Sequence, residues 1–346
     1  MVCHGSSLQI TFMSLELPCL KKLVNWCVLM QCLNYMKPRF PVEAVLSLCG
    51  VLLFLSVLHA VAQDFTSTTG KILSQDWGES QKSFWRNAKP YLDDSLPNLE
   101  KELPELQHLQ PAPNQDRLST ILTHVGHECV DLLERTPDVI AEEQVSIVVD
   151  KALIRREKFG YLVLVQPTPN GLMLQDYRTD NNGLRVSDPA MGSGEGFASM
   201  WVHLFPGNQS ESQFRYLGNQ EVDKHNLIVL AFAQIPDKVK FPPEFVLPSG
   251  PILVFYQGIA WIDPDNWRII RMREDLLAPR PDVKLTGFTA MVRLGAVTAR
   301  RTAASLWLPR EADLTWNLSG QEGRQRYVYS HYRLYEVQTK IITAQP

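Results

Sequence analysis

Three residues with metal-ligating side chains, His124, His127 and Cys129, lie close together in the sequence. They fall in a stretch where apolar residues recur at helical spacing. At about 100° per residue, Cys129 lies in the middle of the apolar stripe and His127 points about 160° away from it. Side chains on such different faces of one helix cannot converge on one ion. We therefore interpret Cys129 as a core residue and the two histidines as solvent-facing, and we predict no metal site.

Three further patterns resemble functional motifs but lack essential parts. Residues 180–183 (Asp-Asn-Asn-Gly) resemble the start of a calcium loop, yet Met191 stands where a bidentate Glu is required. Residues 192–196 (Gly-Ser-Gly-Glu-Gly) are not followed by the Lys-Ser/Thr of a phosphate-binding loop. Ser330 and His331 are neighbours, which point to opposite sides of a strand and cannot form a nucleophile–base pair. The sequence thus predicts a protein that is not an enzyme and has no cofactor.

The N-terminal part reads as an export signal. A short basic segment is followed by the apolar residues 42–58 and by Ala-Val-Ala at 60–62, the small-x-small pattern that signal peptidase recognises. We predict a signal peptide from Met36 to Ala62 and a periplasmic or secreted protein. An uncleaved membrane anchor is the alternative, because the apolar run is close to the minimum for spanning a bilayer. A start at Met36 would explain why residues 1–35 precede the signal.

Charge and cysteine content narrow the classes of partner. The whole chain has 34 Lys and Arg against 37 Asp and Glu, and the first 62 residues contain four of the former and two of the latter. The remainder therefore has a net charge of 30 − 35 = −5, which argues against nucleic acid as a partner. Cys129 is its only cysteine, so stability must come from a core rather than from disulfides.

The sequence predicts three regions. Residues 1–62 are the N-terminal extension and signal peptide, and residues 63–113 are a polar, proline-rich arm or linker. Residues 114–346 are a domain that starts with an amphipathic helix, with Asn114 as a plausible N-cap and a stop at Pro137. The rest of that domain reads as short strands, including an antiparallel meander from Gln213 onward.

The clearest strand signal is a β-hairpin within Pro251 to Leu276. Two runs rich in β-branched and aromatic residues flank residues 263–266 (Asp-Pro-Asp-Asn), which have turn chemistry that also accounts for the paired carboxylates. Both faces of the first run are apolar. The sequence therefore predicts an α+β fold with a curved antiparallel sheet, an open half-barrel, whose faces need cover.

The hairpin motif Gly-Ile-Ala-Trp-Ile-Asp-Pro at 258–264, with Trp-Arg-Ile-Ile-Arg-Met at 267–272, resembles that of the outer-membrane lipoprotein carrier and sorting superfamily. Residues 306–309 (Leu-Trp-Leu-Pro) and 329–332 (Tyr-Ser-His-Tyr) resemble the endings of uncharacterised secreted bacterial proteins of that kind. The resemblance covers roughly the C-terminal 200 residues. It implies an open antiparallel half-barrel with helices on its concave side, where the carriers hold acyl chains. The arm before Asn114 and the loop 236–250 depart from that pattern.

We therefore expect an exported cell-envelope protein that binds a lipid or another apolar ligand in the half-barrel. Eight side chains are expected to line the ligand site: Tyr256, Trp261, Ile270, Met272, Phe288, Val292, Trp307 and Trp316. A short helix ended by Pro206 is expected to act as a lid or plug through Phe197, Met200, Trp201 and Leu204. The alternative is a structural or protein-interaction module of the envelope with a filled core and an envelope protein as partner. A hydrolase without a recognisable motif ranks third.

Overall fold

The computed structural model describes residues 84–85, 88–168, 171–186, 192–193, 197–240, 243–247, 250–299 and 305–335. All of these belong to one compact unit, residues 77–346. The expected signal peptide, the rest of residues 1–62 and the loop 187–191 lie outside the described residues. Among the helices that are described, none has the length and apolar character needed to cross a bilayer.

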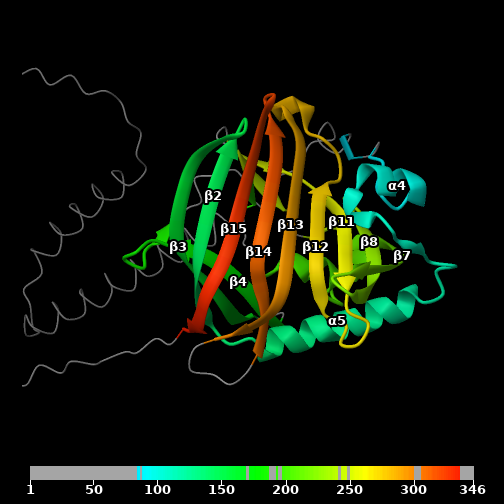
Figure 1. Cartoon of the computed structure of the whole chain (residues 1–346), viewed down its shortest axis with the longest axis horizontal. Helices are drawn as coiled ribbons and strands as arrows, with labels where there is room; N and C mark the ends of the chain where they lie inside the picture. The colour runs from blue at the N-terminus through cyan, green and yellow to red at the C-terminus, as the bar shows by residue number, and fades with distance from the viewer. Residues whose placement is uncertain are drawn as a thin grey trace, which may run out of the picture. The chain divides into compact units, whose positions relative to one another are not determined.

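Twelve strands form one antiparallel sheet in the order β1-β7-β8-β11-β12-β13-β14-β15-β2-β3-β4-β5 (Figure 1). The first half of the strands comprises β1 (Gln110–Pro111), β2 (Val139–Val149), β3 (Ala152–Thr168), β4 (Gly171–Thr179), β5 (Arg185–Val186) and β7 (Ser212–Val222). The second half comprises β8 (His225–Gln234), β11 (Tyr256–Ile262), β12 (Ile269–Leu276), β13 (Leu285–Thr298), β14 (Ser305–Leu318) and β15 (Gln321–Leu334). A separate small sheet contains β6 (Gly192–Ser193), β9 (Glu244–Leu247) and β10 (Gly250–Leu253). The predicted fold class, a curved antiparallel sheet that is not closed, is confirmed.

The predicted hairpin is formed by β11 and β12. Asp263 Oδ1 accepts the backbone N–H of Asp265 at 2.9 Å, and the Trp267 N–H donates to the Asp263 carbonyl at 2.8 Å. The outgoing strand starts later than expected, at Tyr256, because residues 250–253 pair with β9 in the small sheet instead. The turn chemistry therefore predicted the hairpin correctly, but the apolar run before it was divided between two sheets.

Strand β14 continues through a proline. Leu294 is opposite Pro309 and Arg293 is opposite Glu311. Arg310 is skipped, which is a β-bulge, the place where a strand tolerates a proline without an N–H. The Pro309 carbonyl also accepts the buried Tyr332 hydroxyl at 2.6 Å.

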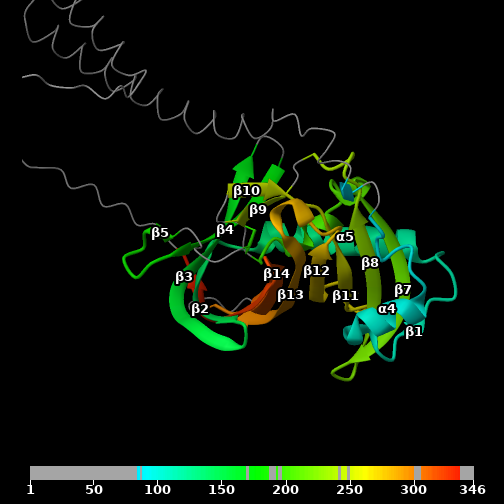
Figure 2. The same cartoon turned by 90° about the horizontal axis from the view of Figure 1, so that it is seen from above.

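The amphipathic helix α5 (Leu118–Arg135) packs on the concave side of the sheet (Figure 2). Ile121, Val125, Cys129 and Leu133 face the sheet, as the stripe predicted, and His124 and His127 are exposed. Asn114 is not the N-cap, because the helix begins at Leu118 and the Asn114 side chain accepts the N–H of Asp116 in the preceding turn.

The second half of the expected arm is part of the folded unit, which differs from the prediction. Helix α4 (Leu96–Glu102) and the 3₁₀ turn η1 (Pro104–Leu106) cover the outer face of β7, β8 and β11. Five apolar side chains anchor them there: Tyr91, Leu99, Leu103, Leu106 and Leu109. The prolines divide these leucines among short turns, so no continuous helical periodicity revealed that they were core residues.

Candidate functional site

Five of the eight residues predicted to line a ligand site lie together on the concave face of the sheet, which we call the inner wall. Met272 and Val292 are cross-strand neighbours on β12 and β13, and Phe288 is opposite Trp316 on β14. Tyr256 on β11 lies 6.2 Å from the Phe288 ring. All five are buried in the main core. Alternation along neighbouring strands explains the grouping, since residues at even spacing share a face.

The Trp316 ring needs a glycine beside it. Gly323 on β15 is directly opposite Trp316, and a Cβ at that position would overlap the indole. The missing side chain therefore lets the indole lie flat over the neighbouring strand.

Two of the eight residues are on the other side of the sheet. Trp261 and Ile270 pack with α4 and η1 in the outer cluster, so the prediction that they line the same wall as Met272 is wrong in its geometry. Trp261 follows Ala260, which faces inward, and alternation turns the indole outward. There the Trp261 Nε1 donates to Gln220 Oε1 at 2.6 Å.

The eighth residue, Trp307, is half-buried at the edge of the main core, toward the start of β14. Its Nε1 donates to the Ile269 carbonyl at 2.9 Å, and the guanidinium of Arg268 lies 5.2 Å from its ring. These contacts join β14 to the start of β12.

The four residues predicted as a lid are buried in the main core on the concave side. Met200, Trp201 and Leu204 belong to the 3₁₀ helix η2 (Met200–Leu204), and the Phe197 ring lies 5.0 Å from that of Tyr327 on β15. A 3₁₀ helix replaces the expected α-helix because the segment is only five residues long before Phe205 and Pro206. We call α5 together with residues 197–205 the plug.

A few polar contacts connect the plug to the sheet. His203 Nε2 lies 3.0 Å from Glu274 Oε1, with both side chains buried, and the imidazole stacks on Phe232. The Ala198 N–H donates to Asp176 Oδ2 at 3.0 Å. Sequence reasoning missed the His203–Glu274 pair, although a glutamate two residues after Met272, on the inward face of β12, was a usable signal.

The part of the inner wall formed by β2, β3, β4 and β15 contains a buried ion pair among its apolar side chains. Glu143 is fully buried and forms an ion pair with Arg178, whose guanidinium lies 5.0 Å from the Tyr327 ring. Burial alone would lower the pKa of Arg178, but the Glu143 carboxylate raises it above its ordinary value. Burial, and after it the Glu143 charge, raises the pKa of Tyr329, so this phenol stays neutral. The Tyr329 hydroxyl has no hydrogen-bond partner within the described residues.

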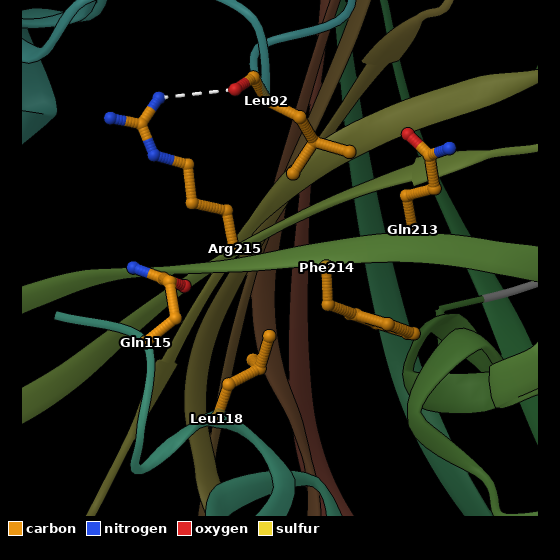
Figure 3. Close-up of a pocket in the computed structure, with 6 residues that line it drawn as sticks. All are labelled: Leu92, Gln115, Leu118, Gln213, Phe214 and Arg215. Atoms are coloured by element: carbon orange, nitrogen blue, oxygen red, sulfur yellow. Dashed lines mark hydrogen bonds between the residues drawn. The ribbon is translucent and has the colours of Figure 1, made fainter.

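Two hollows of the described structure are lined by other residues than those predicted to bind the ligand. One, of about 430 Å³, is at the edge of the sheet beside β7 (Figure 3). Leu92 and Leu118 flank it on either side of the strand, and Arg215 donates to the Leu92 carbonyl at 3.2 Å. The other, of about 340 Å³, is on the outer face. None of the predicted ligand-binding or lid residues lines either hollow. The buried side chains of the plug pack in the main core against the inner wall.

Catalytic and metal-binding chemistry finds little support in the described part of the chain. His203 and Glu274 are in contact, but they are buried between the plug and the sheet and line neither hollow. Within the described ranges, no group of three or more His, Cys, Asp or Glu side chains could hold a metal ion. The non-enzymatic character remains a prediction.

Neither a family model nor a curated protein matches the chain. Solved bacterial structures do. An outer membrane lipoprotein-sorting protein domain from Vibrio parahaemolyticus is 13% identical, with a TM-score of 0.35 over 61% of this chain and 91% of that one. A DUF1329 family protein from Desulfovibrio piger is 12% identical, with a TM-score of 0.36 over 65% and 95%.

A LolA superfamily protein from Nitrosomonas europaea is also 12% identical, with a TM-score of 0.31 over 64% of this chain and 94% of that one. The solved structures found in this way include proteins of the lipoprotein carrier and sorting superfamily, which the sequence motifs weakly resemble.

Proposed function

We propose that this protein binds an acyl chain or a similar apolar ligand between the inner wall and the plug, without catalysis and in the cell envelope. The observation that carries the proposal is the kind of elements that lie over the concave face of the sheet. The part of the inner wall around Met272, Val292 and Phe288 is apolar, and its cover is one helix, one short 3₁₀ segment and, beside Phe288, Phe245 of the small sheet. Such elements contact the wall mainly through apolar side chains, which an acyl chain can replace.

Binding requires the plug to move, because its side chains occupy the wall. A hydrocarbon tail gains roughly 0.8 kcal/mol per buried methylene, so a tail of about ten methylenes recovers on the order of 8 kcal/mol. That gain is comparable to the cost of removing several buried plug side chains from the wall, at about 1.5–3 kcal/mol each. The exchange is therefore close to balanced, as reversible uptake and release require.

The test is native mass spectrometry with lipid extraction on protein purified from the envelope of the producing cell, followed by titration with fatty acids of increasing length. We expect co-purifying lipid and an affinity that rises with each methylene until the wall is filled. Protein that carries no lipid and takes up no fatty acid of any length would contradict the proposal.

The second candidate, an interaction module of the envelope with a filled core, is favoured by one observation. In the described structure, buried plug side chains pack against the inner wall, and none of the predicted ligand-binding residues lines either hollow. This candidate predicts a rigid plug and no uptake in the same titration, so one experiment separates the two.

A further inference from the structure

The outer face of β12, β13 and β14 contains a charged groove of about 340 Å³ that the proposed apolar function does not use. These strands lie side by side in Figure 1, beyond the part of the outer face that α4 covers. Trp261, Arg271, Arg293 and Glu311 form one row across the four strands from β11 to β14, each opposite the next. Glu105 of η1 reaches the groove from above the sheet.

One arginine of this groove has no carboxylate partner in the described part of the chain. Its three carboxylates each have an arginine partner: Glu105 with Arg273 at 2.9 Å, Glu311 with Arg293 at 3.2 Å and Asp313 with Arg324 at 2.7 Å. The fourth arginine of the groove, Arg271, forms no ion pair with any described residue. Arg273 is bound by a fourth carboxylate as well, that of Asp275 at 2.7 Å. Arg271 is therefore the groove arginine whose guanidinium is open to a small anion.

Arg271 is held in an orientation suited to an oxyanion. Its guanidinium lies 4.4 Å from the centre of the Trp261 ring, and its Nε donates to Met291 Sδ at 3.1 Å. The Trp261 ring is fixed in turn by its bond to Gln220. A guanidinium stacked on an aromatic ring keeps its terminal N–H groups available in its own plane, where they match two oxygens of one anion.

The neighbours of Arg271 make an anion favourable. Arg293 is directly opposite on β13, and like charges in that position destabilise a sheet. Partial burial is the main reason why the pKa of Arg271 is lowered. The charges of Arg293 and Arg273 act in the same direction, and those of Glu105 and Asp223 oppose them. A bound anion between Arg271 and Arg293 would remove this repulsion.

The Glu105 carboxylate favours a ligand that carries a hydrogen-bond donor. Its Oε1 binds Arg273, but its Oε2 is buried and has no hydrogen-bond partner within the described residues. An oxyanion that also carries a hydroxyl would satisfy both Arg271 and this oxygen. Sulfate lacks such a hydrogen at neutral pH, whereas hydrogen phosphate and a singly protonated phosphate monoester have one.

We propose that this outer groove binds a phosphate group of the monoester or hydrogen phosphate type, with Arg271 and Arg293 as donors to its oxygens and Glu105 Oε2 as acceptor of its hydroxyl hydrogen. The group could be free or the head of a lipid such as phosphatidic acid, since the chemistry is the same.

The test is isothermal titration of the full-length protein with inorganic phosphate and, separately, with sulfate at the same ionic strength. We expect saturable binding of one phosphate and at least tenfold weaker binding of sulfate. Arg271→Gln should weaken phosphate binding by tenfold or more, as the loss of a charge-assisted pair implies. Arg155→Gln, which removes an arginine paired with Glu157 on β3, is the control and should bind phosphate as the natural protein does.

A second variant tests the proposal independently in case Arg271→Gln does not fold. Arg293 is 58% exposed, so Arg293→Gln should fold and should weaken phosphate binding several-fold. Flotation with vesicles of phosphatidylcholine, with and without phosphatidic acid, distinguishes the source: binding only with phosphatidic acid indicates a lipid head group. Absence of saturable binding in both phosphate and vesicle experiments, or equal phosphate affinity in folded Arg271→Gln, would overturn the proposal. Equal binding of sulfate would overturn the role of Glu105.

Discussion

Leu204→Ala tests whether the plug opens independently of the rest of the fold. Leu204 is fully buried in η2 against the main core. Its truncation removes three carbons, which is about 2.4 kcal/mol at roughly 0.8 kcal/mol per methylene, and the cavity left behind brings the total to about 3 kcal/mol within the usual range of 2–5. If this loss falls on plug opening, the open population rises about 100-fold, at roughly 1.4 kcal/mol per factor of ten.

Cys129 reports the opening. It is 1% exposed on the sheet-facing side of α5, and burial raises the pKa of its thiol, so it reacts only when the plug is open. The assay is the rate of thiol labelling under native conditions, with Cys129 read by peptide mass spectrometry because the chain contains six cysteines. The rate should rise about 100-fold in Leu204→Ala, the same factor as the open population.

The matched control is Leu99→Ala, which truncates a fully buried leucine of α4 in the outer cluster. Both variants should lose similar global stability in denaturant, but Leu99→Ala should leave Cys129 labelling unchanged. If both variants accelerate labelling equally, Cys129 is exposed only by global unfolding. The plug is then an ordinary part of the core, and the reasoning for a movable cover fails.

Three further predictions concern stability. Arg178→Met should cost about 3–5 kcal/mol, because it leaves Glu143 charged and buried, and adding Glu143→Leu should recover most of it in urea unfolding. Arg280 holds the pKa of Asp282 below its ordinary value. The ion pair therefore adds stability above about pH 4, and this stability is lost as the pH falls through the lowered pKa of folded Asp282. In Asp282→Asn, the free energy of unfolding should depend less on pH in that acidic range and should keep its pH dependence outside it. Gly323→Ala should lower stability by about 1–3 kcal/mol, because the new methyl group meets the indole on the next strand, and a thermal melt should show it.

Much of the fold followed from local sequence signals. The turn at 263–266 and the apolar stripe of α5 each depend on neighbouring residues, so they predicted the hairpin and the buried face that includes Cys129. The leucines of residues 96–109 could not be assigned in this way. Their partners, such as Leu217 and Val229, come from strands more than 100 residues later, and prolines interrupt any periodicity of their own.

The candidate site was predictable only in part. Successive side chains of a strand point to opposite faces, and this rule predicted that Met272 faces inward. The same rule, applied to β11, predicts that Trp261 faces outward, as the structure shows. Whether the half-barrel has a hollow or a filled core depends on how closely the plug side chains pack against the sheet. This packing joins residues that are far apart in the sequence, so no local sequence pattern predicts it. The inward position of Glu274 could be predicted from its spacing to Met272, but its partner His203 could not, because the two residues are 71 positions apart.

Photo-crosslinking with a diazirine fatty acid tests the central claim most directly, because it locates the ligand on the protein. If an acyl chain replaces the plug on the inner wall, adducts should form at Met272, Val292 and Trp316 and should compete with unlabelled fatty acid. Adducts confined to outer-face residues such as Leu92, or none that saturate, would contradict the account.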